Sequence, residues 1–423
     1  MSVPVLFGLE SLVAREIRAL GYETHKVEDR RVSFYGDEAA ICRANIWLRT
    51  AERVQVKLGD FTALSFTELF DRVRALPWPE LLTADAAFPV SGHCVSSKLA
   101  SVPDCQSIIK KAVVESMKSK WKTERFAETG PLYKINFNII RDKADIYVDT
   151  SGEGLHKRGY REASTISPIG ETLAAALVAL SGWRPGKALW DPFCGSGTIP
   201  IEAAMIAAKR APGLERGFTA ESWKNPVGDQ PQMTFKKLFD EERARARETY
   251  NDAMIGVGGK NVSDEIGGVG GKNVSVEVGG ASGKNACIEL AGSDLSGQCV
   301  QIARKNAARA GVSPLVRFFQ MDAKNMAKNY IRLPELGIKF PEKGCVVANP
   351  PYGERDSEPT DAALTCREWG PAMNGFRDWN WCVISSLVKF EREIGRTASK
   401  RRKLYNGGIK CQAYLYWGED KAE

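Results

Sequence analysis

The chain has 423 residues, more than one ordinary hydrophobic core accommodates, so we expect two or three domains. It is 43% hydrophobic and 26% charged, and no apolar run approaches the roughly 20 residues that cross a bilayer, which excludes a helical membrane protein. The segment Met1–Glu10 lacks the basic start of a signal peptide, so we expect a cytoplasmic protein. The net charge of +7 allows a polyanionic partner without requiring one.

The ten cysteines are scattered along the chain. They form no Cys-x-x-Cys pair, and no histidine lies nearby at the spacing of a metal ligand. In a cytosolic chain such cysteines are most simply buried thiols. The sequence therefore predicts no metal site.

The first predicted domain covers residues 1–60 and alternates strands with helices. Its elements are strand Val3–Phe7, helix Leu9–Leu20, strand Lys26–Tyr35, helix Ala39–Leu48 and strand Glu52–Phe61. The first helix has apolar residues at helical spacing, and Gly21 follows where a glycine commonly ends a helix. This β-α-β order in a short unit predicts a ferredoxin-like α+β fold.

The second predicted domain covers residues 61–162. Helices are expected at Phe66–Arg74 and Ser107–Trp121, and strands at Ala87–Ser96, Tyr133–Ile140 and Lys143–Thr150. Two basic groups stand out, namely Lys110, Lys111 and Lys118 on a helix, and Lys157, Arg158, Tyr160 and Arg161 near the end of the domain. Each fits two interpretations: a solvated protein surface, or a surface that follows nucleic-acid phosphates and releases their counterions.

The third predicted domain, after the helix Glu171–Leu180, is organised around a strand, a glycine turn and a helix. Ala188–Trp190 is short and apolar, Asp191 ends this strand, and Gly195 and Gly197 form a turn before the apolar run Ile199–Ala208. This arrangement opens a nucleotide site in many open α/β sheets. Glycines leave room for a ligand, and the helix N-terminus offers it unpaired N–H groups.

Three kinds of cofactor site use such a turn. A dinucleotide turn needs a third glycine where this chain has Pro200, and a P-loop needs a lysine after the last glycine, where this chain has Thr198. The remaining pattern, Asp-x-x-x-Gly-x-Gly, resembles the first motif of class I S-adenosylmethionine-dependent methyltransferases. We therefore expect S-adenosylmethionine, with its methionine part facing Asp191, Gly195, Gly197 and Thr198.

The third domain covers residues 163–423, and a glycine-rich repeat interrupts it near residues 256–285. Gly-Lys-Asn recurs every twelve residues, at Lys260, Lys272 and Lys284. Asparagine follows each lysine where a P-loop has Ser or Thr, so this is no phosphate loop. With few large apolar residues, the repeat cannot form its own core, and we interpret it as a flexible insertion or a long β-ribbon.

Helices and strands alternate through the rest of the third domain, which predicts a parallel sheet with right-handed crossovers. Further strands are expected at Ala286–Ala291, Val316–Gln320, Gly344–Ala348 and Trp381–Ser385. Asn406-Gly407 between Arg402–Tyr405 and Ile409–Trp417 predicts an antiparallel hairpin at the edge of the sheet. The fold class is therefore α/β, with a Rossmann-like domain preceded by α+β domains.

Polar residues follow four successive strands, at Asp191, Asp294, Asp322 and Asn349. A single Asp after a strand is usually a turn or cap residue, but residues at the carboxyl ends of parallel strands converge on one ligand site. We expect Asp294 to accept hydrogen bonds from the two ribose hydroxyls. Asp322, with the N–H of Ala323 beside it, would bind adenine.

The segment Asn349-Pro350-Pro351-Tyr352 carries the most specific chemistry. An exocyclic base amine is a poor nucleophile because its lone pair is delocalised into the ring. If the Asn349 side-chain oxygen and the Pro350 carbonyl accept its two hydrogens, the lone pair points at the sulfonium methyl, and Tyr352 can stack on the base. The alternative is a proline turn after a buried strand.

These motifs resemble those of the THUMP-containing RNA guanine-N2 methyltransferases, a family that includes bacterial 23S ribosomal RNA methyltransferases. The resemblance covers nearly the whole chain and rests on Phe7–Glu10, His156–Arg161, Glu171–Ala176, Trp190–Glu202, Asn349–Arg355 and Lys400–Lys410. It implies that a ferredoxin-like domain and a THUMP domain bind RNA, and that a Rossmann-like domain transfers the methyl group. It also favours RNA contacts for both basic groups.

The chain departs from the family pattern in three places. Ser167-Pro168-Ile169-Gly170 lacks the basic residue that the family usually has before Glu171, the glycine-rich repeats are foreign to the pattern, and Asp356–Trp369 is unusually polar. These departures put in doubt how the substrate is positioned near the helix expected after Arg355.

The sequence thus predicts methylation of a guanine N2 amine in RNA, with 23S ribosomal RNA favoured. The reacting base would be unstacked to reach the strand ends. Alternatives are the same reaction on transfer RNA, methylation of adenine N6 or cytosine N4 in DNA, and a non-catalytic RNA-binding protein of ribosome assembly.

Overall fold

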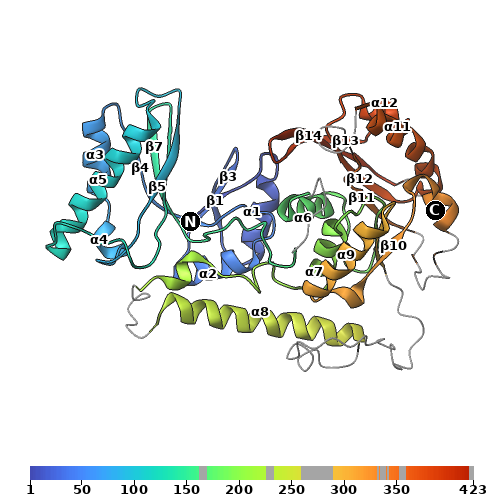
Figure 1. Ribbon diagram of the computed structural model, residues 1–423, viewed down its shortest axis with the longest axis horizontal. Helices are drawn as coiled ribbons and strands as arrows, with labels where there is room; N and C mark the ends of the chain where they lie inside the picture. Colours follow the sequence, from blue (N-terminus) through green and yellow to red (C-terminus); the bar gives the residue numbers. More distant parts are fainter. Residues whose placement is uncertain are drawn as a thin grey trace. The chain divides into compact units, whose positions relative to one another are not determined.

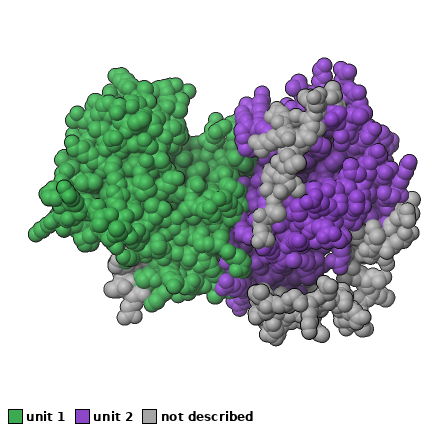
Figure 2. Space-filling model, in the orientation of Figure 1, with its two compact units in different colours: residues 1–157, 215–244 green, residues 158–214, 245–423 purple. Residues whose placement is uncertain are grey.

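The computed structural model describes residues 1–161, 169–224, 233–258, 289–330, 333, 340, 343–351 and 359–418. The chain forms two compact units: unit 1 is residues 1–157 with 215–244, and unit 2 is residues 158–214 with 245–423 (Figure 2). In its described part, each unit has one seven-stranded sheet with helices (Figure 1). None of the helices described is both long and apolar enough to span a membrane.

Unit 1 joins both predicted N-terminal domains in one sheet with the strand order β2-β3-β1-β4-β7-β6-β5. Its elements are β1 (Ser2–Pro4), α1 (Glu10–Ala19), β2 (Thr24–Glu28), β3 (Arg31–Phe34), α2 (Glu38–Trp47), β4 (Gln55–Thr62), α3 (Phe66–Arg74), α4 (Trp78–Leu81), β5 (Val90–Val95), α5 (Val102–Trp121), β6 (Ile135–Ile140), β7 (Lys143–Asp149) and η1 (Thr219–Ser222). Strand β4 makes the sheet continuous, because it pairs with β1 on one side and with β7 on the other.

Two features of unit 1 differ from the sequence prediction. The single strand predicted at Lys26–Tyr35 is two antiparallel strands, β2 and β3, because the chain turns at Arg30, whose φ is 64°. Residues 215–244, predicted to be in the third domain, belong to unit 1. There Trp223 stacks on Tyr133 at 4.6 Å between ring centroids, and Trp47 Nε1 donates to Glu242 Oε1 at 3.0 Å.

Unit 2 has the strand order β10-β9-β8-β11-β12-β14-β13. Its elements are α6 (Glu171–Leu180), β8 (Ala188–Asp191), α7 (Thr198–Ala207), β9 (Leu290–Asp294), α9 (Gly297–Arg309), η3 (Ser313–Leu315), β10 (Val316–Gln320), η4 (Ala323–Asn325), α10 (Met326–Tyr330), β11 (Gly344–Ala348), α11 (Pro359–Trp369), η6 (Gly370–Phe376), β12 (Asn380–Ser385), α12 (Phe390–Ile394), β13 (Lys400–Asn406) and β14 (Ile409–Tyr416). Helix α8 (Phe235–Gly258) begins in unit 1 and ends in unit 2.

The sheet of unit 2 confirms the predicted topology. Strands β8 to β12 are parallel, and β14 and β13 add an antiparallel pair at one edge. The strand order reverses between β8 and β11, and open α/β sheets bind their ligands beyond the carboxyl ends at such a point. Strand β9 begins at Leu290, later than predicted, and the glycine-rich repeats lie outside the described residues except for 256–258.

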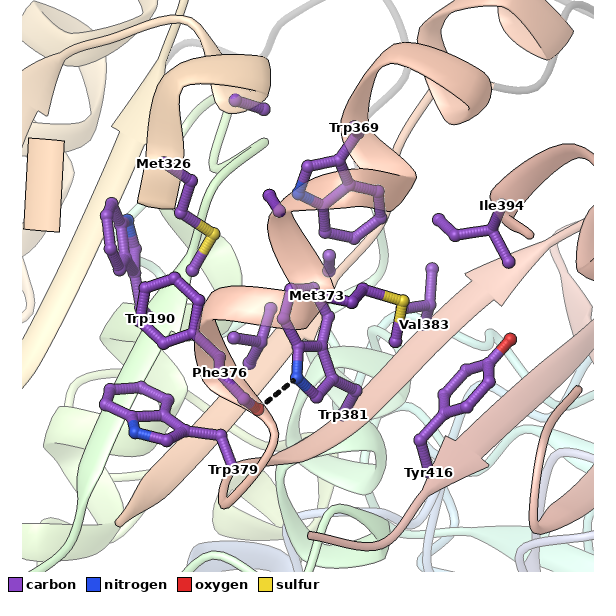
Figure 3. Close-up of a cluster of buried hydrophobic side chains, with 14 of the residues drawn as sticks. Trp190, Met326, Trp369, Met373, Phe376, Trp379, Trp381, Val383, Ile394 and Tyr416 are labelled. Atoms are coloured by element: carbon purple, nitrogen blue, oxygen red, sulfur yellow. Dashed lines mark hydrogen bonds between the residues drawn. The ribbon is translucent and has the colours of Figure 1, made fainter. Parts of the chain in front are cut away.

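A cluster of large buried side chains supports the strands that reach this switch point. Trp190, Phe376, Trp379 and Trp381 lie among its aromatic rings, and Met326 and Met373 also belong to it (Figure 3). The Trp381 Nε1 donates to the Phe376 carbonyl oxygen at 3.4 Å. Because buried aromatic rings are closely packed, this cluster fixes the positions of the strand ends.

Candidate functional site

The turn after β8 is held by backbone hydrogen bonds. The Cys194 N–H donates to the Ser293 carbonyl at 2.9 Å, which ties the turn to β9, and the Gly197 N–H donates to the Cys194 carbonyl at 2.7 Å. Gly197 has φ of 84°, and a Cβ there would lie 2.8 Å from the Ala303 Cβ. The backbone conformation of this residue and its packing against α9 therefore require glycine. We had expected glycine here for a different reason, namely to leave room for a ligand.

Asp191 ends β8 as a deeply buried carboxyl group, 1% exposed. Its Oδ1 accepts the Phe193 N–H at 3.0 Å. Burial raises the pKa of Asp191 well above its ordinary value; the Phe193 hydrogen bond opposes this shift, and the charge of Asp294 adds to it. No cationic side chain of the described residues contributes to the shift, so the Asp191 carboxylate would gain from a cationic ligand.

Asp294 ends β9 and contacts the same turn. Its Oδ2 accepts the Gly195 N–H at 3.0 Å, and its Oδ1 accepts the Ser296 N–H at 2.9 Å. The side chain is half-buried, and each carboxylate oxygen retains capacity for a further donor. Just before these two acids, Trp190 Nε1 donates to Ser293 Oγ at 3.0 Å, which couples β8 to β9.

Asp322 lies after β10 and caps the short helix η4. Its Oδ1 accepts the Lys324 N–H at 3.0 Å, and its Oδ2 lies 3.1 Å from Lys324 Nζ. The neighbouring Ala323 is buried. The helix cap and the ion pair are what an Asp after a strand ordinarily makes. An adenine amine bound here would share this carboxylate with Lys324.

The sheet brings these residues together in the order Asp322, Asp294, Asp191 and Asn349. The strands they follow, β10, β9, β8 and β11, are adjacent and parallel. Neighbouring strands are about 4.8 Å apart, so the row spans roughly 14 Å at one edge of the sheet.

Asn349 follows β11, all of whose residues are buried. Its Oδ1 is buried and accepts no hydrogen bond in the structure as described. An unsatisfied buried acceptor is costly, and such groups in native proteins call for an explanation. A donor from a bound ligand would satisfy it. Pro350 is buried beside it, and Tyr352 lies outside the described residues.

Arg158 and Tyr160 are buried, each 4% exposed, which does not agree with the predicted RNA contacts. Both contact Glu202 of α7: Arg158 Nε lies 3.5 Å from Glu202 Oε1, and the Tyr160 hydroxyl donates to the same oxygen at 3.2 Å. Burial, followed by the charge of Glu202, raises the pKa of Tyr160 well above its ordinary value. The sequence could not reveal this, because Glu202 lies far along the chain.

Arg161 is also turned toward the protein. Its Nη2 donates to Thr198 Oγ1 at 2.6 Å and to the Ile169 carbonyl at 2.8 Å, and its Nε lies 3.5 Å from Glu171 Oε1. Thr198 is the first residue of α7, so Arg161 links the segment before α6 to the glycine turn. Sequence reasoning missed this link.

The predicted basic groups of unit 1 are largely paired. Lys110 Nζ lies 2.6 Å from Glu128 Oε2, and Lys118 Nζ lies within 3.1 Å of acidic oxygens on Glu115 and Glu124. Lys157 Nζ lies 2.7 Å from Glu153 Oε1. Lys111 is exposed, with its Nζ 5.9 Å from the centroid of the Phe70 ring. These contacts agree better with a solvated surface than with a row of available cations.

One further polar residue holds the site. Asn306 is 2% exposed, and its Nδ2 donates to the Ser196 carbonyl in the glycine turn at 3.0 Å. Asn306 lies near Val300, Ala303 and Ala307, on the buried side of α9. A polar residue within this apolar pattern was the signal that sequence reasoning overlooked.

The described residues contain no group of three or more His, Cys, Asp or Glu side chains able to hold a metal ion. The nine cysteines in those ranges are free thiols.

Models of known families match three parts of the chain. Residues 158–414 match the model described as the RMKL-like methyltransferase domain, residues 1–55 match the RlmL ferredoxin-like domain, and residues 63–149 match the THUMP domain.

Individual proteins resemble the chain over nearly its whole length. A Bacillus subtilis (strain 168) protein, "Putative RNA methyltransferase YpsC", is 40% identical over 415 residues, which are 97% of this chain and 94% of that protein. A crystal structure described as "a predicted N6-adenine-specific DNA methylase" from Listeria monocytogenes is 38% identical, with a TM-score of 0.81 and coverage of 99% of this chain and 96% of that one. The structure of "SMU.472, a putative methyltransferase complexed with SAH" is 33% identical, with a TM-score of 0.79 and coverage of 100% and 98%.

Proposed function

This chain belongs to the RMKL-like methyltransferase family, and we propose that it transfers a methyl group from S-adenosylmethionine to the N2 amine of a guanine in RNA. The THUMP match and the name of the B. subtilis relative support RNA as the substrate class. We favour 23S ribosomal RNA, since the resemblance to the family that includes bacterial 23S ribosomal RNA methyltransferases extends through both units.

The strand-end residues fit S-adenosylmethionine. The buried Asp191 carboxylate has no cationic partner among the described residues, and the α-amino group of the methionine part carries the charge it lacks. Gly195, Gly197 and Thr198 would line the same part, Asp294 would accept from the ribose hydroxyls, and Asp322 with Ala323 would bind the adenine. The SAH in the structure of SMU.472 supports this choice of cofactor. When bound, S-adenosylmethionine would supply an electrophilic methyl group.

The single observation that carries the substrate chemistry is the buried, unsatisfied Oδ1 of Asn349, just after the strand that pairs with β8. Asn349 Oδ1 and the Pro350 carbonyl would accept the two hydrogens of the guanine amine. This fixes the amine with its lone pair directed toward the cofactor, and Tyr352 would stack on the base. Positioning then replaces a charged general base before transfer, and the proton leaves the more acidic methylated amine afterwards.

Labelled S-adenosylmethionine and total RNA from cells that lack the enzyme test this proposal. We expect label in the large ribosomal RNA, recovered as N2-methylguanosine after digestion, and little label with the Asn349→Ala variant. If the protein binds the cofactor but labels no RNA or DNA, or binds no cofactor, the enzyme proposal fails and a non-catalytic RNA-binding role is favoured.

The same experiment separates two other substrates. Label in the transfer RNA band alone would make transfer RNA the substrate. DNA deserves a separate test for two reasons. The Listeria structure is described as a DNA methylase, and an Asn-Pro-Pro-Tyr segment can position any exocyclic base amine. Unmethylated genomic DNA that acquires N6-methyladenine or N4-methylcytosine, while RNA acquires nothing, would replace the RNA proposal.

A further inference from the structure

A strongly basic stretch lies at residues 389–410. Residues 389–410 contain eight Lys or Arg residues and two Glu residues, an excess of six positive charges, whereas the whole chain has an excess of seven. Five of these cations lie on the antiparallel pair β13–β14, which we call the basic hairpin: Lys400, Arg401, Arg402, Lys403 and Lys410.

The cations of the basic hairpin face solvent. Lys400, Arg401, Lys403 and Lys410 are exposed, and β13 is the outermost strand of its sheet. Arg401 pairs with Glu391 of α12 at 2.5 Å. The other acid of this stretch, Glu393, pairs with Arg367, and Lys403 Nζ lies 5.7 Å from the centroid of the Tyr405 ring.

The strand register places the basic hairpin relative to Asn349. Ala348 pairs with Val383 of β12, so Asn349 lies level with Ile384, one residue before the end of β12. The last residue of β12, Ser385, pairs with Gln412, and Gln412 pairs with Lys403. Lys403 is therefore level with the strand ends.

The rest of the hairpin extends beyond this edge. Leu404, Tyr405 and Asn406 pair with Cys411, Lys410 and Ile409, all past the end of β12. At about 3.4 Å a residue, the hairpin extends roughly 10 Å past the strand ends. In the order β11-β12-β14-β13, β14 is two strands from β11 and β13 is three, so Lys410 lies roughly 10 Å and Lys403 roughly 14 Å to the side of Asn349.

We propose that the basic hairpin binds the phosphates of nucleotides that flank the target base, with Lys403 and Lys410 as its main contacts. The inference rests on the proposed function, because it assumes a polynucleotide at Asn349. A base that reaches Asn349 remains connected to its neighbours, so flanking phosphates must lie within a few nucleotides of the strand ends. Exposed cations at this distance, on the same edge, meet that backbone and attract it.

An edge strand offers a competing explanation. Lysines on an exposed edge also prevent a sheet from pairing with another chain. That role predicts self-association when the lysines are removed, and no effect on RNA binding. The two explanations therefore differ in what is measured.

The test compares Lys403→Gln/Lys410→Gln with a matched control, Arg184→Gln/Lys187→Gln. The control removes two exposed cations just before β8, at the amino end of the sheet, opposite the site. Methyl transfer to total RNA from cells lacking the enzyme is measured against RNA concentration at several KCl concentrations. Filter retention of the same labelled RNA measures binding independently of turnover.

We expect the hairpin variant to raise the KM and Kd for RNA about tenfold, with kcat and cofactor affinity within about twofold of the unmodified enzyme. Its slope of log affinity against log salt should be shallower by about 1.4, roughly 0.7 for each lost single-strand contact. The control should change neither quantity. Equal RNA affinity and salt slope in both variants would overturn the proposal, and self-association of the hairpin variant alone would then assign the lysines to edge protection.

Failure of the proposed function gives a different result. If the unmodified enzyme transfers no methyl group to RNA, the function itself is wrong, whatever the binding curves show. If it does transfer and the hairpin variant binds RNA normally, only the hairpin inference is lost.

Discussion

Unit 2 buries polar groups in two regions that use them differently. In the buried network, Glu202 contacts both Arg158 and Tyr160, so its charge and their donors satisfy one another. In the strand-end site, Asp191 lacks a cation and Asn349 Oδ1 lacks a donor among the described residues. Burial alone therefore does not mark a functional residue. At the strand ends, a buried group without a protein partner points to a ligand, because a bound ligand can then provide what is missing.

The largest expected effect is on the buried network. Glu202→Ala should lower the free energy of unfolding by about 3–5 kcal/mol, because it removes the buried carboxylate that Arg158 and Tyr160 both contact. Urea unfolding followed by circular dichroism measures this change. As a matched control, Glu153→Ala breaks the exposed pair with Lys157 and should hardly move the midpoint; equal effects of the two variants would contradict the comparison.

The strand-end site should respond in the opposite way. Asn349→Ala should lower kcat by about 10²–10³, the usual effect of losing one positioned hydrogen-bonding group, while the unfolding midpoint stays the same or rises. The midpoint does not fall because the lost oxygen is an unsatisfied acceptor. Single-turnover methyl transfer and urea unfolding measure the two quantities. A large loss of stability with normal transfer would assign Asn349 to the scaffold.

Asp191→Asn should weaken cofactor binding about 10- to 100-fold, because it removes a charge-assisted contact of about 1.5–3 kcal/mol. Isothermal titration calorimetry with S-adenosylhomocysteine measures the affinity. Unchanged affinity would show that the methionine amine binds elsewhere.

The pH dependence of stability provides a second test of Asp191. Its pKa is raised in the folded protein, so the folded state binds more protons than the unfolded state above the ordinary pKa of about 3.9. The contribution of Asp191 to stability is therefore present at acid pH and is lost as pH rises from there toward its folded pKa. Without cofactor, the free energy of unfolding of Asp191→Asn should rise relative to that of the unmodified protein as pH rises from 4 to 8. A difference that falls over this range would contradict a raised pKa of Asp191.

The smallest expected effect belongs to Tyr160→Phe. It removes the hydroxyl that donates to Glu202 but keeps the ring, so it should cost about 1 kcal/mol of stability. Cofactor affinity and RNA affinity should not change, since the ring remains and the hydroxyl is buried. Weaker RNA binding by this variant would restore the RNA contact first predicted from the sequence.

Local signals in the sequence predicted much of unit 2. The apolar run Gly344–Ala348 is strand β11 as predicted, and the predicted hairpin is β13–β14, in which Asn406 ends β13 and Gly407-Gly408 forms the turn. Parallel strands buried on both faces read as continuous apolar runs, which makes them easy to locate. The expectation that polar residues follow successive strands came from the glycine turn and the alternation of strands and helices, whereas their order across the sheet came from the structure.

Predictions that depended on distant partners were less successful. Arg158, Tyr160 and Arg161 form a basic aromatic run typical of an RNA-binding surface, yet Glu202, Glu171 and Thr198 turn them inward. Residues 215–244 joined unit 1 through Trp223 and Glu242, whose partners lie far away in the chain.

The sequence by itself determined the family, the alternation that builds the second sheet, and the residue types at its strand ends, because these depend on neighbours within a few positions. Only the tertiary structure decided which charges are buried, which are paired, and that Asn349 Oδ1 has no partner in the described residues. These properties depend on side chains brought together by packing from remote parts of the chain, which periodicity and spacing do not record.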